Sequence, residues 1–186
     1  VLRREACEAC GECVAACVAG ALAVKGRRVT AGVLADRAER MRVFFDNSGG
    51  GITLSGGEVT AQPDFAEAVL RLCRQRGIHT AIETNLCWPW ERVAAVLDVT
   101  DLVMAGVKLA DDDAHRRWTG RGNGQVLANL QALSEAGVPV IVRTPVVAGV
   151  NAAAEEIGPI ADAVADVQGL LYYELLPYHP LGAGKY

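Results

Sequence analysis

Short apolar segments alternate with longer segments of helical periodicity over most of the chain. The short segments are largely apolar, which predicts buried parallel strands. The longer segments carry apolar residues on one helical face, and two of them stop at glycines, Gly77 and Gly137, as helices commonly do. The predicted strands are 52–54, 78–83, 102–108, 139–143 and 170–175, and the predicted helices are 64–76, 90–97, 125–136 and 153–164. This alternation predicts an α/β fold in which right-handed crossovers join parallel strands, as an open sheet or a barrel.

Polar residues gather where these strands end. In parallel α/β folds, ligands bind at the carboxyl ends of the strands. We therefore expect the chemistry of the protein at these positions, which are Ser55–Glu58, Glu83–Asn85, Lys108, Arg143 and Pro177–His179.

The segment before the first strand has a different composition. Residues 1–28 are rich in Cys, Gly and Ala, and residues 29–50 are a connector with a predicted helix over 31–42 and a loop over 46–51. Four of the six cysteines of the chain lie within residues 7–17. Such crowding suits a metal site better than a disulfide framework, which would tie distant segments together.

The four cysteines have the spacing C-x2-C-x2-C-x3-C, which is typical of a bacterial ferredoxin-type cluster loop. Structural zinc usually takes two well-separated cysteine pairs, so this spacing favours iron and sulfide over zinc. Val18 replaces the proline that usually follows the last cysteine. We expect a 4Fe–4S cluster in a small ferredoxin-like module over residues 1–28, with the ligands Cys7, Cys10, Cys13 and Cys17.

The overall composition excludes some classes of function. The chain has 186 residues, of which 51% are hydrophobic and 22% charged, with a formal net charge of −4. This balance argues against general nucleic-acid binding, which needs a basic face. No apolar run reaches the roughly 20 residues of a membrane helix, and no signal peptide is visible, so we expect a cytoplasmic protein. The chain lacks an initial Met and stops directly after a predicted strand, which we interpret as part of a longer protein.

Several motifs together resemble one family over essentially the whole chain. They are Ser48–Glu58 with Gln62–Phe65, Gly77–Asn85, Asp101–Met104 with Lys108, the His115…Trp118-Thr119-Gly120…Asn123 segment, and Leu175–Gly182. These motifs resemble the glycyl radical enzyme activating enzymes of the radical S-adenosylmethionine superfamily, in the subgroup that carries a ferredoxin-type insert. The resemblance implies a partial (β/α) radical S-adenosylmethionine barrel over residues 29–186, without its first strand and at least one C-terminal element.

The resemblance also implies roles for residues near the first two strand ends. The turn Gly56-Gly57-Glu58 corresponds to the turn that binds the amino group of S-adenosylmethionine. Glu83 and Thr84 correspond to an acidic strand end near the methionyl group and the peptide substrate.

Three later residues complete the implied cofactor site. Lys108 corresponds to a lysine that contacts the cofactor, where a cation suits its carboxylate. Arg143 corresponds to an arginine facing the site, and His179 to a histidine near the adenosyl or ribose end. Two departures stand out: Gly106 replaces an aspartate common in the family, and Leu86 stands where a glycine often follows Thr84 by two residues.

Two further features are interpreted as structural. The acidic run Asp111-Asp112-Asp113 cannot face a single ion from one helix, and it predicts a helix amino terminus. Cys87 is interpreted as a packed cysteine rather than a reactive thiol.

The resemblance implies an oxidoreductase that generates a glycyl radical on a partner glycyl radical enzyme, with electrons from a donor such as flavodoxin or ferredoxin. The family's catalytic Cys-x3-Cys-x2-Cys is absent from these residues, so no catalytic residue is assigned and we expect the chain alone to be inactive. Two alternatives remain: an electron-transfer iron–sulfur protein, and a radical S-adenosylmethionine enzyme acting on a small molecule. The Gly-Gly-Glu turn, Lys108 and His179 count against the first, and the ferredoxin-type segment and Pro-Tyr-His-Pro-Leu-Gly terminus count against the second.

Overall fold

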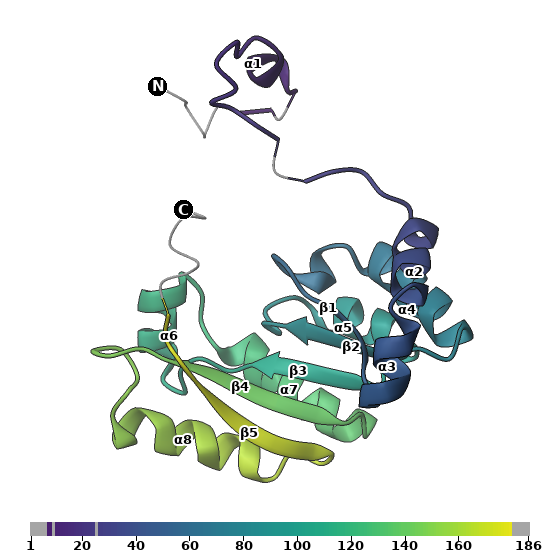
Figure 1. Cartoon of the computed structure of the whole chain (residues 1–186). Coiled ribbons are helices and arrows are strands. Elements are labelled where there is room, and N and C mark those ends of the chain that lie inside the picture. Colours follow the sequence, from purple (N-terminus) through teal and green to yellow (C-terminus); the bar gives the residue numbers. More distant parts are fainter. Residues whose placement is uncertain (1–6, 9, 25, 180–186) are drawn as a thin grey trace. The chain divides into compact units, whose positions relative to one another are not determined.

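The computed structural model of the protein describes residues 7–8, 10–24 and 26–179 (Figure 1). The chain divides into two compact units, Val1–Thr30 and Ala31–Tyr186. The first unit contains one short helix, α1 (Glu12–Ala15), which begins after Gly11 in a left-handed conformation, φ +83°. None of the described residues before residue 31 is buried.

The second unit is built on a five-stranded sheet whose strands follow one another in chain order. All neighbouring strands are parallel, and Figure 1 shows them as one twisted fan. The strands are β1 (Gly51–Leu54), β2 (His79–Thr84), β3 (Leu102–Gly106), β4 (Val140–Val146) and β5 (Leu170–Pro177). The predicted parallel α/β sheet is confirmed. The last two strands are longer than predicted, because they stay paired as far as Val146 and Pro177.

Helices connect the strands, and η2 (Val59–Ala61), a single 3₁₀ turn, follows β1. The helices are α2 (Ala31–Glu39), α3 (Arg42–Ser48), α4 (Pro63–Gln75), α5 (Trp90–Leu97), α6 (Asp112–Thr119), α7 (Gly124–Ala136) and α8 (Ala154–Ala165). No helix in the described part of the chain is long and apolar enough to cross a membrane.

The connector before β1 differs from the prediction. One helix over 31–42 and a loop over 46–51 were expected, but two helices, α2 and α3, occupy this segment. Arg42 stabilises the break by pairing with Glu39 and donating a hydrogen bond to the carbonyl oxygen of Arg76. Gly49 then ends α3 in a left-handed conformation, φ +66°. The polar residues before Gly49 thus form the last turn of a helix instead of a loop.

The two faces of the sheet have different surroundings. One face packs on the helices through the main core, which includes Ile82, Val103 and Val142 with side chains of α4, α5, α7 and α8. The other face carries only a small apolar cluster, Ala81, Met104 and Ile141. Side chains alternate along a strand, so the residues two positions further along, Glu83, Gly106 and Arg143, lie on this second face. They are polar or small.

Candidate functional site

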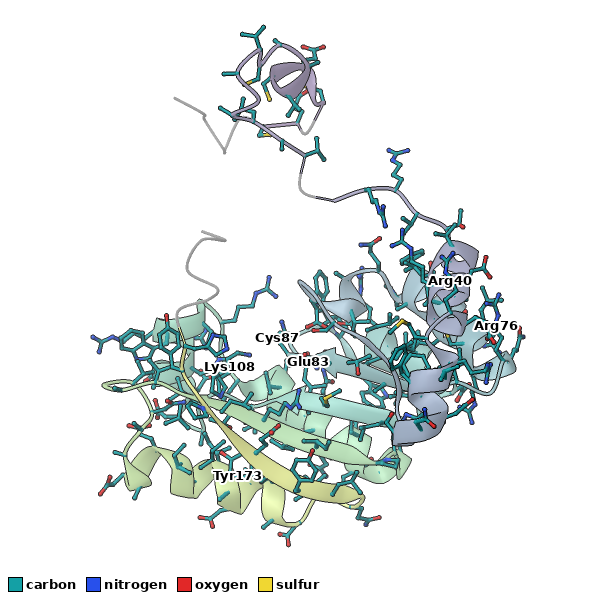
Figure 2. The ribbon with its side chains drawn as sticks, viewed as in Figure 1. Arg40, Arg76, Glu83, Cys87, Lys108 and Tyr173 are labelled. Carbon is teal, nitrogen blue, oxygen red and sulfur yellow. The ribbon has the colours of Figure 1, made fainter. Side chains whose placement is uncertain are left out.

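The carboxyl ends of β1 to β4 border a cleft of about 320 Å³. Figure 2 shows Glu83 and Lys108 at this end of the sheet. The cleft is lined by Ser55, Gly56, Gly57, Glu58, Glu83, Thr84, Asn85, Gly106, Lys108, Arg143, Pro145 and Leu176. Seven of the eight predicted cofactor-binding residues therefore lie together, and their contact with a cofactor stays a prediction.

His179 is the predicted site residue that the structure does not bring into this cleft. It is exposed, two residues beyond the end of β5, and it is not among the residues that line the cleft. The rest of the motif that suggested it, Pro180-Leu181-Gly182, lies outside the described residues.

The carboxylate of Glu58 is fully engaged by the protein. One oxygen accepts hydrogen bonds from the backbone N–H and hydroxyl of Thr60, at 3.1 and 2.7 Å, and from the hydroxyl of Thr84 at 2.7 Å. The other oxygen accepts from the backbone N–H of Asn85 at 2.9 Å. Glu58 therefore ties the turn after β1 to the end of β2. Its carboxylate has little capacity left for a ligand, because a carboxylate offers about four acceptor positions.

The glycines of this turn leave room in front of it. Gly56 has φ +124°, a conformation that side chains rarely adopt, and a Cβ atom at Gly56 or Gly57 would meet no atom within 4 Å. The backbone of the turn is thus open to a ligand that approaches closely.

A chain of polar contacts crosses the floor of the cleft. The hydroxyl of Ser55 donates to Glu83 at 2.8 Å, and the guanidinium of Arg143 lies 3.6 Å from the other oxygen of Glu83. Arg143 also donates through Nε to Glu174 of β5 at 2.7 Å. Gly106 is paired with Arg143 in the sheet, and a Cβ there would come within 3.5 Å of the Lys108 ammonium nitrogen. A side chain at position 106 would therefore contact Lys108.

A buried amide and a buried hydroxyl fix the backbone at Lys108 and Val107. Asn151, which is 2% exposed, donates to the carbonyl oxygen of Lys108 at 2.9 Å. The hydroxyl of Thr144 donates to the carbonyl oxygen of the preceding Val107. The ammonium group is therefore carried by an anchored loop. The lining contains two carboxylates, Glu58 and Glu83, and two cations, Lys108 and Arg143, a balance that suits a zwitterionic ligand.

Leu86 follows this cleft in a strained conformation. Its φ of +54° is the only positive φ of a non-glycine residue in the described chain, and its side chain is fully buried. The side-chain amide of Asn129 on α7 donates to the carbonyl oxygens of Leu86 and Trp88, at 2.8 and 2.7 Å. Leu86, which stands where the family often has glycine, thus keeps the positive φ that glycine readily adopts. The buried amide of Asn129 holds it in this conformation. The sequence offered only one hint of Asn129: a polar residue on the apolar face of its helix.

The acidic run and the following motif are structural. Asp111 caps α6 by accepting from the backbone N–H of Ala114 at 2.7 Å, which confirms the predicted helix amino terminus. The buried His115 ring hydrogen-bonds the carbonyl oxygen of Arg121 at 2.6 Å, and Asn123 donates to the carbonyl oxygen of Leu109. These contacts fix the turn between α6 and α7.

The cysteine segment fits an iron–sulfur cluster by its donors, although the thiols are not gathered. Cys7, Cys10 and Cys13 are exposed, and no group of three or more metal-binding side chains surrounds a common point among the described residues. Hydrogen bonds from backbone groups, that of Leu22 first, lower the pKa of the Cys17 thiol. Thiolate donors beside backbone N–H groups suit iron–sulfur chemistry, so these ligands remain a prediction that the chemistry supports.

Comparisons with known proteins agree in sequence and fold. The radical SAM superfamily matches residues 13–158. The isethionate sulfite-lyase activating enzyme of Oleidesulfovibrio alaskensis is 42% identical, over 98% of this chain and 60% of the relative. The pyruvate formate-lyase-activating enzyme of Clostridium pasteurianum is 38% identical, over 87% of this chain and 67% of the relative. The chain spans about 60% of the length of the isethionate relative.

Solved structures show the same fold. A domain of a pyruvate-formate lyase-activating enzyme from Bacteroides vulgatus matches with a TM-score of 0.65 and 34% identity, over 70% of this chain and 81% of that one. Streptococcus suis SuiB bound to S-adenosylmethionine matches with a TM-score of 0.67 and 15% identity, over 84% of this chain and 35% of that one. At this lower identity the likeness shows the fold alone.

Proposed function

Because this chain belongs to the radical S-adenosylmethionine superfamily, among the glycyl radical enzyme activating enzymes, we propose that the protein generates a glycyl radical on a partner enzyme. When bound beside a reduced 4Fe–4S cluster, S-adenosylmethionine would supply the 5′-deoxyadenosyl radical that takes a hydrogen atom from the partner's glycine. The cleft that gathers seven predicted cofactor-binding residues at the strand ends is the observation that supports this proposal.

Different residues of the cleft would bind different parts of the methionyl group. The ammonium of Lys108, on its anchored loop, would pair with the carboxylate of the cofactor. The open backbone of Gly56 and Gly57 would accept the amino group. Glu58 would act as a positioning residue, because its carboxylate already holds the turn in place.

Glu83 and Arg143 would define the opposite wall of the site. The guanidinium of Arg143 lies 3.6 Å from one oxygen of Glu83, and the hydroxyl of Ser55 donates a hydrogen bond to the other. A carboxylate held in this way can accept hydrogen bonds from the cofactor or from the glycine segment without moving, which is the advantage of a preorganised site. Thr84 would contribute through Glu58, to which its hydroxyl donates.

The remaining parts of the proposal concern clusters and partners. Cys7, Cys10, Cys13 and Cys17 would hold an auxiliary 4Fe–4S cluster that relays electrons from flavodoxin or ferredoxin in the cytoplasm. The family's Cys-x3-Cys-x2-Cys does not occur in these residues, so the 186-residue chain alone should bind S-adenosylmethionine without cleaving it.

Reconstitution of the full-length protein tests the activity. It would be loaded anaerobically with iron and sulfide, reduced with dithionite, and mixed with S-adenosylmethionine and a glycyl radical enzyme. We expect 5′-deoxyadenosine together with a glycyl doublet in the EPR spectrum. Clusters that are reduced without forming 5′-deoxyadenosine would favour an electron-transfer protein. Deoxyadenosine without a glycyl doublet would favour a small-molecule substrate.

Binding to the chain itself gives a second, independent test. In isothermal titration with S-adenosylmethionine, Lys108→Gln should weaken binding by about tenfold, since a charge-assisted hydrogen bond contributes roughly 1.5 kcal/mol. Arg117→Gln is the matched control, because this arginine lies on α6 beside the Trp118 ring, outside the cleft. Equal affinities of the two variants would contradict the role of Lys108.

A further inference from the structure

The segment that carries Lys108 belongs to neither a helix nor a strand. It spans residues 107–110, between β3 and α6, and is called the lysine segment below. Val107 and Leu109 are buried, whereas Lys108 is half-buried and lines the cofactor cleft (Figure 2). The segment thus presents one cation to the cleft, between two buried apolar side chains.

Each carbonyl oxygen of the lysine segment accepts a hydrogen bond from a buried side chain. The hydroxyl of Thr144 donates to the carbonyl oxygen of Val107. The side-chain amide of Asn151 donates to that of Lys108 at 2.9 Å. The side-chain amide of Asn123 donates to the carbonyl oxygens of the next two residues. All three donor side chains are at most 5% exposed, so water does not compete for these hydrogen bonds.

The three donors come from different parts of the fold. Thr144 lies on β4, Asn151 in the loop between β4 and α8, and Asn123 directly before α7. Asn151 uses its whole amide group. It also donates to the carbonyl oxygen of Pro145 at 2.9 Å, and it accepts from the backbone N–H of Val147 at 2.8 Å. The lysine segment is therefore tied to β4 and to two separate connections.

This arrangement goes beyond what a connection between a strand and a helix requires. Most connections run over the surface, where water satisfies their carbonyl oxygens. Burying an amide or a hydroxyl is costly unless each is hydrogen-bonded. Two amides and a hydroxyl are buried here to hold a short irregular segment. Since lysine has a long flexible side chain, a fixed backbone restricts the positions that its ammonium group can reach.

We propose that Asn123, Thr144 and Asn151 are positioning residues that hold the Lys108 ammonium where the carboxylate of S-adenosylmethionine binds. None of the three is among the residues that line the cofactor cleft, so they act through the backbone of the lysine segment. The inference rests on the proposed function, from which it takes the contact between Lys108 and the cofactor. Asn151 holds the backbone of Lys108 itself and has the largest effect.

Titration of the full chain with S-adenosylmethionine measures this effect. Asn151→Ala should weaken binding by about fivefold, because a cation that is no longer held in place contributes less to affinity. Asn129→Ala is the matched control. The amide of Asn129 is just as buried and also donates to two backbone carbonyl oxygens, but these belong to the loop after β2. Its loss should leave the affinity nearly unchanged.

A double variant separates positioning from a general loss of stability. If Asn151 acts through the ammonium group, Asn151→Ala should have no further effect on affinity in a Lys108→Gln background. The same fivefold loss in both backgrounds would overturn the proposal. It is also overturned if Asn151→Ala binds as tightly as the unchanged chain, or if Asn151→Ala and Asn129→Ala lose affinity equally.

A second pair of variants does not depend on whether Asn151→Ala folds. Thr144→Val keeps the shape of the side chain and removes its hydroxyl, whereas Thr144→Ser keeps the hydroxyl. Thr144→Val should weaken binding of S-adenosylmethionine by about threefold, and Thr144→Ser should bind like the unchanged chain. Equal affinities of these two variants overturn the proposal if Asn151→Ala does not fold.

The position of the ammonium group can also be followed without the cofactor. The lysines of the chain are Lys25, Lys108 and Lys185, and in a sample with ¹³C at Cε the Lys108 signal is identified with Lys108→Gln. This signal should move in Asn151→Ala and stay in place in Asn129→Ala. An unmoved signal in Asn151→Ala overturns the positioning role. A moved signal, with full affinity of Lys108→Gln for S-adenosylmethionine, instead overturns the cofactor contact taken from the proposed function.

Discussion

Leu86 is the residue at which the packing of the core and the conformation of the backbone compete. Its left-handed φ of +54° costs energy for a leucine, and its buried side chain repays that cost. Leu86→Ala and Leu86→Gly both remove the packing, which should cost about 2–4 kcal/mol. Glycine adopts positive φ readily, so Leu86→Gly should be more stable than Leu86→Ala by about 1 kcal/mol. Urea unfolding of the two variants checks this order, and a more stable alanine variant would contradict it.

Glu58 gives a second prediction at the residue scale, because both of its oxygens accept hydrogen bonds. In Glu58→Gln, an NH₂ group must face the N–H of Asn85 or the donors of Thr60 and Thr84. This mismatch should lower the free energy of unfolding by about 1–3 kcal/mol.

Glu83→Gln is the matched control for Glu58→Gln. The side chain of Glu83 is 43% exposed and its ion pair with Arg143 is long, 3.6 Å. Its loss should therefore change stability by less than about 1 kcal/mol. Equal destabilisation of the two variants would show that Glu58 is no more committed to the turn than Glu83.

At the scale of elements, helix α7 supports the loop that follows β2. Asn129→Ala would leave the carbonyl oxygens of Leu86 and Trp88 without their buried donor. We expect a loss of about 2–4 kcal/mol in unfolding free energy and faster amide exchange at Cys87. Gln131→Ala on the exposed side of the same helix should change neither quantity. Unchanged exchange at Cys87 would show that the loop keeps its shape without α7.

The start of α6 gives a prediction of pH dependence. The hydrogen bond from Arg116 and then the backbone N–H of Asn123 lower the pKa of Asp112. Since the folded pKa lies below the unfolded value of about 3.9, the contribution of Asp112 is fully present above that value and is lost as the pH falls through the folded pKa. The Asn123 amide resonance should therefore move as the pH falls below the unfolded value. Asp112→Asn should remove this titration, and a persistent titration would assign it to another group.

The elements themselves were largely predictable from the pattern of hydrophobic residues. Strands buried by helices on one face read as apolar runs, and glycines marked where helices stop, as Gly77 and Gly137 do. The pattern failed at α3, where Asp46-Asn47-Ser48 precede Gly49 and look like a loop, because a short helix that ends in polar residues has the same composition as a turn.

At the scale of the whole molecule, topology made the cleft predictable and its inner contacts unpredictable. Parallel strands bring their carboxyl ends to one edge, so residues far apart in sequence, such as Gly56 and Arg143, were expected together and do line one cleft. Sequence spacing carries no information on which acid accepts which donor, so the engagement of Glu58 by Thr60 and Thr84 was not foreseen. The position of His179 could not be predicted from the strand order either, because this residue follows the last strand and no strand pairing fixes it.

The two units should also differ in what stabilises them. None of the described residues before residue 31 is buried, whereas the apolar clusters consist entirely of residues from Ala31 onward. A small segment without a core needs another source of free energy to fold, and metal binding at its cysteines would supply it. Removal of iron with a chelator should therefore abolish amide protection between residues 7 and 30 and leave the thermal unfolding of the sheet unchanged.

Cysteine variants identify the ligands in this prediction. Cys13→Ser should lower the iron and sulfide bound after anaerobic reconstitution and weaken the visible absorption of the cluster. Cys87→Ser is the matched control, because Cys87 lies beside Lys108 in the second unit, and it should bind as much iron as the unchanged protein. Equal iron contents in the two variants would show that the cysteine segment does not hold the cluster. A drop in the unfolding temperature of the sheet on chelation would show instead that the first unit stabilises the second.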